Sequence, residues 1–471
     1  MRTLPLNRFL LLAAALLPFC GSLASGFHFD DYAIFQDPAI QSSNGWLSVW
    51  ALRQTRPLTY LTFWLNFQLG GENPVGYHAL NLALHAAAVW LLYECLKLGA
   101  QREAFFAALI FAVHPIQAEA VNYVWGRSIV LAAIFTFAAW RDWQRSHEWR
   151  AVAWFACALL AKEECAAFPL ALAVCEWTRE KRRWPPLAAM FALSLAAAGR
   201  VVYAIAVTPG APAGTQSGIT PWNYFLAQGA VIWRYLRLLV LPFGFTVDSQ
   251  IDVPPVWLGA LAWIALAAIA IYAWRYSRWF AIGLILLLPS SSIFPAEDLS
   301  ADRRMYLALA AFAAFAAALI RRPQILTVIA VALALLSVGR TYVWMSDERL
   351  WREAVERAPL KVRPKIQLAR NVAPAEALTL LADAERLAPA DANVHSEIGK
   401  VYLTQGNAAA ALNEFGRALA LDPRDARHYN NRGAALLALG QRDAARRDFE
   451  RALTLDPALV EARANLLRMA K

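Results

Sequence analysis

The hydrophobic positions of this chain gather into long runs separated by short polar stretches. A bilayer needs about 20 apolar residues for each helical crossing, and about eleven runs come close to that length. They cover residues 6–26, 78–98, 103–120, 127–141, 149–162, 164–178, 186–207, 254–274, 279–295, 304–320 and 323–342. The fifth and sixth runs are short, so their ends are less sharply defined. The pattern predicts a membrane-embedded bundle of helices.

The pattern changes after about residue 346, where Ala, Arg, Glu and Leu follow a helical period and the sequence repeats every 34 residues. A turn glycine recurs (Gly406 and Gly440), as does an aromatic residue (Phe415 and Phe449). The same offset relates Ala418 to Ala452, Leu421 to Leu455, and Asp422-Pro423 to Asp456-Pro457. One period upstream, the matching positions hold Leu381, Ala384, Leu387 and Pro389, without the turn glycine. This period and these positions are typical of tetratricopeptide repeats.

We therefore predict an all-α protein with a polytopic membrane helical bundle and a C-terminal repeat solenoid. The bundle covers residues 1–345, with outer loops at 30–77 and 208–252. A linker helix and a degenerate repeat cover 346–392, two repeats cover 393–457, and a capping helix covers 458–471. Solenoids of this kind offer a concave surface for peptides or proteins, so we expect binding there, not catalysis.

Composition supports the membrane class, because 59% of the 471 side chains are hydrophobic and 19 are Trp. Basic residues fall at every second boundary between runs, which marks those ends as cytoplasmic. They are Arg2, Arg8, Lys97, Arg102, Arg141, Arg145, Arg150, Arg179, Lys181, Arg182, Arg183, Arg275, Arg278, Arg321 and Arg322. Acidic residues collect at the opposite boundaries: Asp30, Asp31, Glu72, Glu119, Glu163, Glu164, Asp248, Asp252, Glu297, Asp298 and Asp302. The N-terminus is then cytoplasmic and the repeats lie on the other side. A cleaved signal peptide over residues 1–26 is the alternative for the first run.

The net charge of +10 is largely this topological signal, and we expect no nucleic-acid partner. The five cysteines lie in or beside expected spans and resemble small apolar residues, not a disulfide framework. The spacing of His, Cys and carboxylate residues does not resemble a dedicated metal cage, so we expect no metal and no cofactor.

Two outer segments have a character of their own. Residues 30–77 are rich in aromatic residues and predict helices that lie in the membrane interface. Thr208–Pro221 is rich in Gly, Pro, Ser and Thr and predicts a flexible loop. Trp222–Leu241 is long enough to span, but the charge alternation favours an interfacial or re-entrant helix with Arg234 and Arg237 on its polar side.

Several segments together resemble one known family. They are FHFDDYAIFQDPAI, RPLTYLTFWLNFQLGGENPVGYHALNLALH, FAVHPIQAEAVNYVWGRS, LLAKEE and SSIFPAEDLSADRRMYL, followed by the repeats. This set is similar to the transmembrane and tetratricopeptide-repeat O-mannosyltransferases, which are C-type membrane glycosyltransferases (GT-C). The resemblance implies transfer of a sugar from a polyprenyl-phosphate lipid to Ser or Thr of a protein acceptor. It also implies that Asp30 and Asp31 match the acidic pair of the family's first outer loop. The array here is shorter than in animal members, so the acceptor cannot be carried over.

The residues themselves offer the chemistry that such a transfer needs. A sugar on a lipid phosphate has an activated anomeric carbon, so transfer requires a base for the acceptor hydroxyl and cations for the departing phosphate. Either Asp30 or Asp31 is the expected base, and the other would orient the acceptor or its partner. Direct displacement would invert the anomeric centre. Solvated charge beside a first span is the alternative interpretation of the pair.

Guanidinium groups suit phosphate because their fork donates two hydrogen bonds at once. The candidates for the donor phosphate, in order of preference, are Arg303, Arg304, Lys162, Arg127 and Arg56. Candidates for other substrate contacts are His114, Glu163, Tyr77 and His78. Each has a structural alternative: Arg303 and Arg304 as membrane anchors, Lys162 and Glu163 as a local ion pair, and His114 as a helix cap. A polar contact inside the bundle is the default for His78 and His85.

Mannose is the sugar that the resemblance implies, and the composition and compact array favour a bacterial inner membrane. Two other functions remain open. One is a lipid-linked glycosyltransferase with a glycan or lipid acceptor. The other is a non-enzymatic membrane scaffold whose repeats recruit partners. A transporter fits less well, because charged residues cluster at the ends of the spans.

Overall fold

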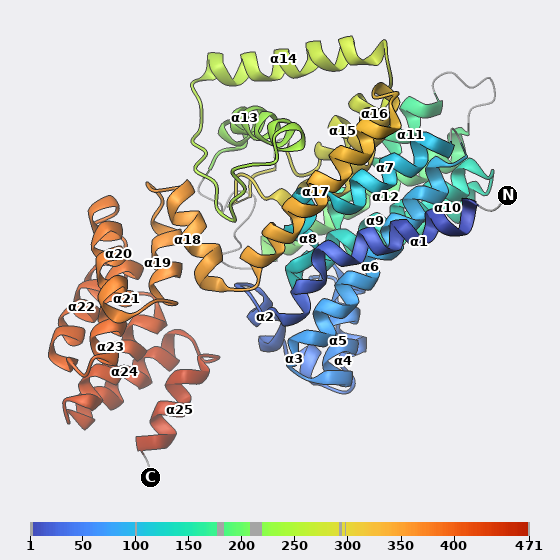
Figure 1. Cartoon of the computed structure of the whole chain (residues 1–471). Helices are drawn as coiled ribbons and strands as arrows, with labels where there is room; N and C mark the ends of the chain where they lie inside the picture. Colours follow the sequence, from blue (N-terminus) through green and yellow to red (C-terminus); the bar gives the residue numbers. More distant parts are fainter. Residues whose placement is uncertain are drawn as a thin grey trace. The chain divides into compact units, whose positions relative to one another are not determined.

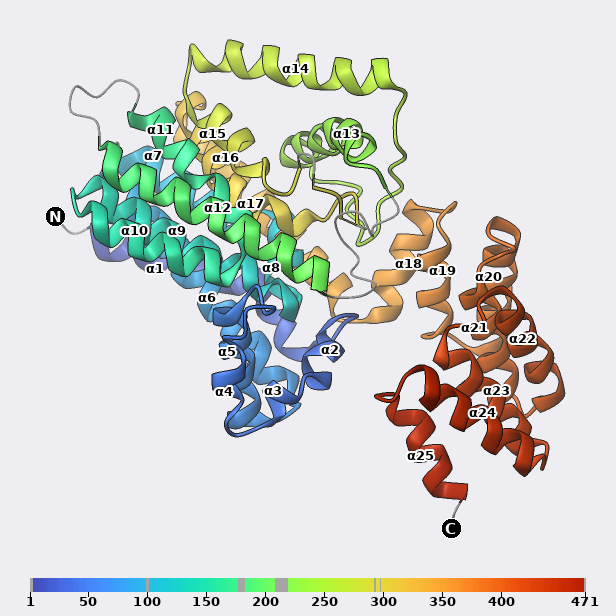
Figure 2. The ribbon, with the colours of Figure 1, turned by 180° about the vertical axis from the view of Figure 1, so that it is seen from behind.

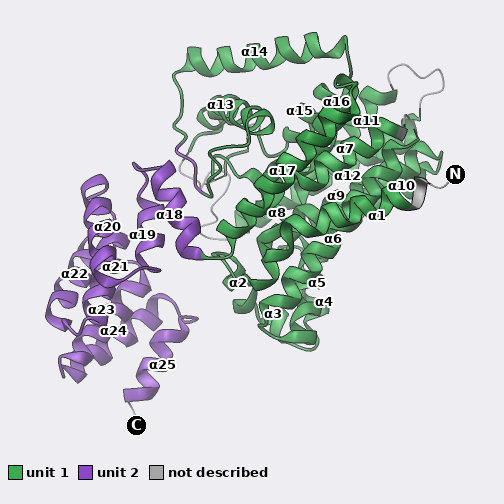
Figure 3. Cartoon of the chain, in the orientation of Figure 1, with its two compact units in different colours: residues 1–247, 251–346 green, residues 248–250, 347–471 purple. Residues whose placement is uncertain are grey.

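The computed structural model describes residues 3–98, 101–176, 183–207, 219–291, 294–296 and 298–469. The regular elements of these residues are helices, which confirms the all-α prediction (Figure 1). The chain forms two compact units, coloured separately in Figure 3. Unit 1 comprises residues 1–247 and 251–346, and unit 2 comprises residues 248–250 and 347–471.

The helices of unit 1 follow the expected apolar runs. In chain order they are α1 (Thr3–Leu16), η1 (Leu17–Ala24), α2 (Asp31–Gln36), α3 (Pro38–Gln41), α4 (Gly45–Ser48), α5 (Pro57–Gly70), α6 (Pro74–Leu96), α7 (Gln101–Val113), η2 (Pro115–Gln117), α8 (Ala118–Asn122), η3 (Val124–Gly126), α9 (Arg127–Gln144), α10 (Glu148–Ala161), η4 (Glu163–Ala167), α11 (Phe168–Glu176), α12 (Trp184–Val207), α13 (Pro221–Val240), α14 (Val256–Trp274), α15 (Trp279–Leu287), η6 (Asp302–Arg304), α16 (Met305–Leu319) and α17 (Pro323–Trp344).

These helices pack as a bundle in which α1, α6, α7, α9, α10, α16 and α17 lie side by side (Figures 1 and 2). Helix α16 is at the centre, because its residues are buried on nearly every side, as expected for a helix that is apolar all round. Many of the buried positions are alanines, such as Ala132, Ala133 and Ala317, and their small side chains let neighbouring helices approach closely.

Five helical segments of the described chain are long and apolar enough to cross a membrane. They are Leu6–Ala24, Pro74–Leu96, Trp184–Val207, Val256–Trp274 and Pro323–Trp344. A sixth candidate is the pair Arg102–Val113 and Pro115–Asn122, which is bent by 51°. The sequence predicted one continuous run here, but Pro115 has no backbone N–H and breaks the helix. With these segments the chain is a multi-pass membrane protein. The count of eleven spans stays a prediction.

Helix α13 forms where the interfacial or re-entrant helix was expected, and it is not among the span candidates. It packs against α14 at two glycines. A Cβ on Gly259 would lie 2.9 Å from Leu226, and one on Gly229 would lie 3.1 Å from Ala262. Arg234 faces a polar partner, because it forms an ion pair of 2.6 Å with Asp302 that leaves its side chain 12% exposed.

The predicted flexible loop lies largely outside the described residues, since residues 208–218 are not among them. Arg179, Lys181 and Arg182, which belong to the predicted pattern of basic boundaries, also lie outside the described residues. Residues 30–77 form the short helices α2 to α5 at one end of the bundle (Figure 1). Their buried side chains gather around Phe35, Phe63 and Tyr77. Trp46 and Trp50 remain exposed, so the interfacial position of these helices stays a prediction.

Unit 2 consists of paired helices. They are α18 (Asp347–Arg357), α19 (Val362–Ala369), α20 (Pro374–Leu387), α21 (Ala392–Thr404), α22 (Ala408–Leu421), α23 (Ala426–Ala438), α24 (Arg442–Leu455) and α25 (Val460–Met469). The repeated glycines Gly406 and Gly440 have φ of 77° and 76°, a left-handed conformation that glycine adopts without strain.

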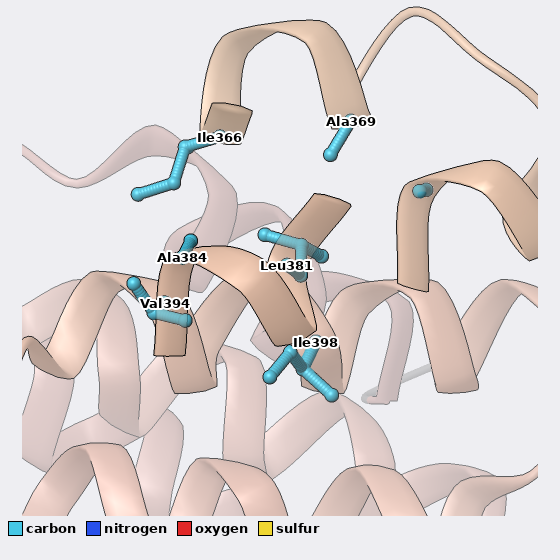
Figure 4. Close-up of a cluster of buried hydrophobic side chains, with 7 residues drawn as sticks. Ile366, Ala369, Leu381, Ala384, Val394 and Ile398 are labelled. Carbon is cyan, nitrogen blue, oxygen red and sulfur yellow. The ribbon is translucent and has the colours of Figure 1, made fainter. Parts of the chain in front are cut away.

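The degenerate upstream repeat is the pair α19 and α20, whose core is shown in Figure 4. Leu381 is fully buried there, at the position that Phe415 and Phe449 occupy one and two periods later. A leucine fills less space than a phenylalanine. In the later repeats a glycine of the facing helix lies against the ring, whereas the equivalent position of this repeat is Lys365.

Candidate active site

The acidic pair lies at the start of α2, with Asp30 as its N-cap and Asp31 as its first residue, and the structure separates the two members. Asp30 is exposed, whereas Asp31 is fully buried. The Asp31 carboxylate accepts hydrogen bonds from two backbone N–H groups: His28 N lies 3.0 Å from Oδ2, and Trp125 N lies 2.8 Å from Oδ1. The preceding residue, Phe29, has a φ of 35°, a strained conformation for a bulky side chain. Asp31 is thus fixed in place, and Asp30 is left facing outward.

Burial raises the pKa of Asp31 to about 7. The backbone N–H groups and the nearby His28 ring lower this pKa, but they do not outweigh the loss of water. The Asp31 carboxyl is therefore partly protonated near neutral pH, and it is poorly placed to reach an acceptor from outside.

His28 belongs to the same cluster, and its hydrogen-bond direction follows from its neighbours. The Ser25 hydroxyl donates to the carbonyl oxygen of Trp344 at 3.0 Å and lies 3.0 Å from His28 Nε2. A hydroxyl has one proton to donate, so His28 Nε2 must donate to Ser25 Oγ. This bond holds the buried His28 ring beside the acidic pair. The sequence analysis did not single out His28 or Ser25.

Tyr123 connects the acidic pair to the cations. Burial, Asp31 and Asp30 raise the pKa of Tyr123 well above its ordinary value, and Arg303 opposes them. A hydrogen bond with the Asp30 side chain also contributes to this raised pKa. Contacts of Tyr123's own segment hold two of these charged groups, because the Trp125 N–H donates to Asp31 and Glu119 accepts from Arg303. The carboxylates and a cation thus meet around a tyrosine that the sequence analysis did not consider.

The two adjacent arginines differ in their surroundings. Arg303 binds Glu119 twice: its backbone N lies 3.2 Å from Oε2, and its guanidinium donates to Oε1. Its side chain remains 23% exposed. Arg304 is buried and its guanidinium donates to Asp298 O, Leu299 O and the Tyr224 hydroxyl at 2.8, 3.0 and 3.4 Å. Arg303 can therefore reach a ligand, while Arg304 holds the segment before η6 against α13.

Two more cations come from the start of α5 and from the junction of α10 with η4. Arg56 donates to both Glu163 oxygens, at 3.0 and 2.5 Å. Burial by itself would raise the pKa of Glu163, but Arg56 outweighs it and lowers the pKa to about 2. Lys162 is buried and pairs with Glu164 at 3.1 Å. The charges of Arg56 and Arg303 both act on Lys162. The structure therefore brings three of the predicted phosphate-binding cations together.

A groove of about 220 Å³ adjoins this cluster, between α10 and α12. Its wall is mostly apolar, with Leu159, Leu160, Leu193, Ala196 and Ala197 among the lining residues. Glu163 and Arg200 supply polar groups to the same groove. Arg200 also donates to three carbonyl groups of the loop before α5, those of Ala51, Leu52 and Gln54. An apolar groove beside clustered cations suits a lipid chain that carries a phosphate.

The remaining candidates have structural partners. Arg127 is fully buried and its guanidinium donates to Asn81, Thr62 and the Tyr77 carbonyl, which ties α9 to α5 and α6. The Tyr77 hydroxyl donates to Gly71 O, at 3.1 Å. These two groups hold the bundle together, and we do not include them in the proposed phosphate site.

The histidines also follow their structural alternatives. The Nδ1 atom of His114 accepts from the backbone N of Ile116, so His114 caps η2. His78 Nε2 lies 3.1 Å from Gly26 O. His85 lies 2.8 Å from the Tyr306 hydroxyl, inside the bundle. Of the three histidines, His78 is linked most directly to the acidic pair. It contacts Gly26, which precedes His28 by two residues in the segment that leads into the pair.

Sequence reasoning missed Glu119 as the partner of Arg303, and Glu164 as the partner of Lys162. A signal was available for Glu119. A positive charge on the expected outer face is unusual, and a buried arginine needs a carboxylate. The sequence analysis placed Glu119 on that same face without pairing the two.

Three metal-ligating side chains gather in unit 2. Ligand atoms of Asp422, Asp425 and His428 lie within 4.8 Å of one another. Arg427 already binds both oxygens of Asp425, at 3.0 Å from Nε. Its guanidinium therefore occupies the place that a cation would take.

Comparisons with known proteins agree with this picture. Two family models described as tetratricopeptide repeat match residues 392–425 and 426–459. A protein O-mannosyl-transferase of Caenorhabditis elegans is 26% identical over 408 residues, which cover 76% of this chain and 58% of the relative. The human protein O-mannosyl-transferase TMTC3 is 45% identical over 92 residues, which cover 19% of this chain and 10% of the relative. The chain thus spans about 58% of the length of the nematode relative it matches.

Among solved structures, a tetratricopeptide-repeat protein of Thermus thermophilus is 22% identical, with a TM-score of 0.25. The match covers 31% of this chain and 89% of that one. The resemblance inferred from the motifs is confirmed, because the curated homologues are protein O-mannosyl-transferases and the repeats match family models.

Proposed function

We propose that this homologue of the protein O-mannosyl-transferases transfers a sugar from a polyprenyl-phosphate lipid to Ser or Thr hydroxyls of protein acceptors. Mannose is the first candidate for the sugar, from the printed names of the relatives. The reaction takes place on the non-cytoplasmic side of a bacterial inner membrane, where the repeats also lie. The observation that carries the proposal is that residues 119–125 hold both sides of the site: the Trp125 N–H donates to Asp31, and Glu119 accepts from Arg303.

Asp30 is the general base in this proposal, because it is exposed while Asp31 is buried and held by two backbone N–H groups. Asp30 takes the proton of the acceptor hydroxyl as the oxygen attacks the anomeric carbon. The new bond from carbon to the acceptor oxygen forms as the bond from carbon to the phosphate oxygen breaks. Attack from the face opposite the leaving group inverts the anomeric centre.

The lipid phosphate leaves with the bonding electron pair and gains negative charge, so cations aimed at it lower the barrier. Arg303 is the main candidate for this contact, supported by Arg56 and Lys162. The apolar groove beside Glu163 would hold the first isoprene units of the lipid. Ion pairs with Glu119 and Glu163 keep these cations in place before the donor arrives.

The test is transfer by the purified full-length protein in lipid nanodiscs. The donor is a radiolabelled polyprenyl-phosphate mannose and the acceptor is a Ser/Thr-rich peptide. We expect label on the peptide, with inversion at the anomeric carbon. A hexose increment that is missing from envelope proteins of cells without the gene would support the same conclusion. No transfer with any polyprenyl-phosphate hexose, and no lost modification in cells, would overturn it.

A further inference from the structure

One face of α13 binds the segment that carries Arg303. Tyr224, Gln228 and Tyr235 are fully buried and share this face, because positions four and seven apart in an α-helix lie on one side. The Gln228 amide donates to Leu299 O at 2.9 Å. This face of α13 therefore lies along the segment that leads into η6.

The neighbours of Arg303 within η6 are tied to the same helix. Asp302 forms an ion pair of 2.6 Å with Arg234, and the Arg304 guanidinium donates to the Tyr224 hydroxyl at 3.4 Å. The side chain of Arg303 takes another direction, because its guanidinium donates to a carboxylate of α8. The residues on both sides of Arg303 are thus anchored on α13, and Arg303 itself is left to face the candidate active site.

Tyr235 holds the residue at which this turn starts. Its hydroxyl accepts from Ala301 N at 2.9 Å and donates to Ala301 O at 2.9 Å. A hydroxyl has one proton to donate and lone pairs to accept, so one oxygen satisfies both backbone groups of a single residue. Both residues are buried, so water does not replace the hydroxyl. Tyr235 thus fixes the backbone two residues before Arg303.

The position of Arg303 needs such support. The turn η6 has only three residues, and the residue before it, Ala301, is extended, with φ of −145° and ψ of 125°. A turn this short has few backbone hydrogen bonds of its own. A guanidinium fork binds a phosphate through two parallel hydrogen bonds, which require a defined orientation. A displacement of about 1 Å in a positioned group can cost about a hundredfold in rate.

We propose that Tyr235 is a positioning residue, which acts through Ala301 to place the Arg303 guanidinium against the phosphate of the lipid donor. Tyr235 is buried and does not touch the donor itself. The identity of the ligand, a lipid-borne phosphate, rests on the proposed function. A purely structural role of Tyr235 makes a different prediction: fewer folded molecules, with unchanged affinity in those that remain.

The experiment uses the full-length protein in lipid nanodiscs and two measurements. One is the affinity for radiolabelled polyprenyl phosphate, and the other is the KM for polyprenyl-phosphate mannose during transfer. Tyr235→Phe removes only the hydroxyl and should weaken both about tenfold, while the KM for the acceptor peptide stays the same. The matched control is Tyr272→Phe, which removes the hydroxyl of an exposed tyrosine on α14 and should change neither value.

A double variant tests whether Tyr235 acts through Arg303. In the background of Arg303→Lys, Tyr235→Phe should have little further effect on donor affinity, because both changes remove the same interaction. Losses that multiply would overturn the proposal. A lower kcat with unchanged affinity and unchanged KM values would also overturn it, since that result means only fewer folded molecules.

A second variant keeps the proposal testable if Tyr235→Phe does not fold. Gln228→Met removes the contact with Leu299 and no charge, and it should weaken the affinity for polyprenyl phosphate about threefold. Unchanged affinity in this variant would then overturn the proposal. The two measurements also separate the two proposals. Binding of polyprenyl phosphate that depends on Tyr235, without any transfer, would overturn the proposed function and support the role of Tyr235.

Discussion

The candidate active site of unit 1 and the repeats of unit 2 are built in different ways. In unit 1, the bonds that make the site join residues far apart in sequence, with separations of 94 for Asp31 and Trp125 and 184 for Arg303 and Glu119. In unit 2, Asn431 donates to Ser396 and Asn465 donates to Asn430, so two bonds between the first helices of neighbouring repeats join residues 35 apart. The first arrangement occurs once and depends on the whole bundle. The second arises from a repeated local unit.

The two regions also treat charge differently. The site in unit 1 concentrates buried carboxylates and cations, so loss of one partner leaves a charge that water cannot reach. Several ion pairs of unit 2 lie at its surface instead, such as Arg352 with Glu348 at 2.8 Å, where water reaches both partners. Changes in unit 1 should therefore affect chemistry and pH dependence, and changes in unit 2 should affect stability and binding.

The largest expected effect is on transfer, from Asp30→Asn. Loss of the base should lower the rate about a thousandfold, as is typical for general-base catalysis. Transfer of label from the lipid donor to a Ser/Thr peptide measures it. The control is Glu72→Gln, an exposed acid of the same outer segment, which should keep its activity. An active Asp30→Asn variant would remove Asp30 from the mechanism and weaken the contrast between the two units.

The next effect is the pH dependence of stability, from Asp31. Its pKa in the folded protein is about 7, above the value of about 3.9 for an unfolded chain. The protonated form is thus favoured by folding, and its contribution is complete below about pH 4 and lost as the pH rises towards 7. The loss is at most about 4 kcal/mol.

Thermal unfolding of the purified protein across this range measures the pH effect. Asp31→Asn should flatten the part of the profile between pH 4 and 7, since asparagine does not titrate. Asp252→Asn, which changes an exposed acid of unit 1, should leave the profile unchanged. A profile that stays the same in Asp31→Asn would mean that another group carries the pH dependence.

A smaller effect tests the guanidinium group of Arg303. Arg303→Lys retains the charge but loses the guanidinium fork, so transfer should fall about ten- to a hundredfold and the KM for the lipid donor should rise. Arg237→Lys is the control, because Arg237 donates to Phe243 O outside the cation cluster. Donor titrations under otherwise identical conditions decide the outcome. Equal kinetics for both variants would exclude a bidentate contact from Arg303.

The smallest expected effect tests the packing of the repeats. A Cβ on Gly433 would lie 2.7 Å from the Phe449 ring, so Gly433→Ala should destabilise the protein by about 1–3 kcal/mol. Gly416→Ala is the matched control, because Gly416 lies in a helix and open space surrounds it. It should stabilise by about 0.5–1 kcal/mol. Thermal unfolding measures both, and equal midpoints would show that the helices can separate to admit a methyl group.

The sequence by itself determined the local structure of this protein. Apolar runs and basic boundaries predicted the helices of unit 1, and the 34-residue period predicted the turn glycines Gly406 and Gly440 together with the ring of Phe415. It also identified the acidic pair and Arg303 as candidates. These features follow from periodicity and backbone chemistry, which act over a few residues or recur at a constant spacing.

Only the tertiary structure decided which candidates differ from their neighbours. Asp30 and Asp31 are adjacent and identical in sequence, but the backbone N–H of Trp125 reaches only Asp31 among the two carboxylates. Arg127 was a candidate together with Arg303, yet its guanidinium donates to three residues of α5 and α6. The physical reason is that burial, and therefore charge state and available hydrogen bonds, depends on segments that are distant along the chain and unique in the fold.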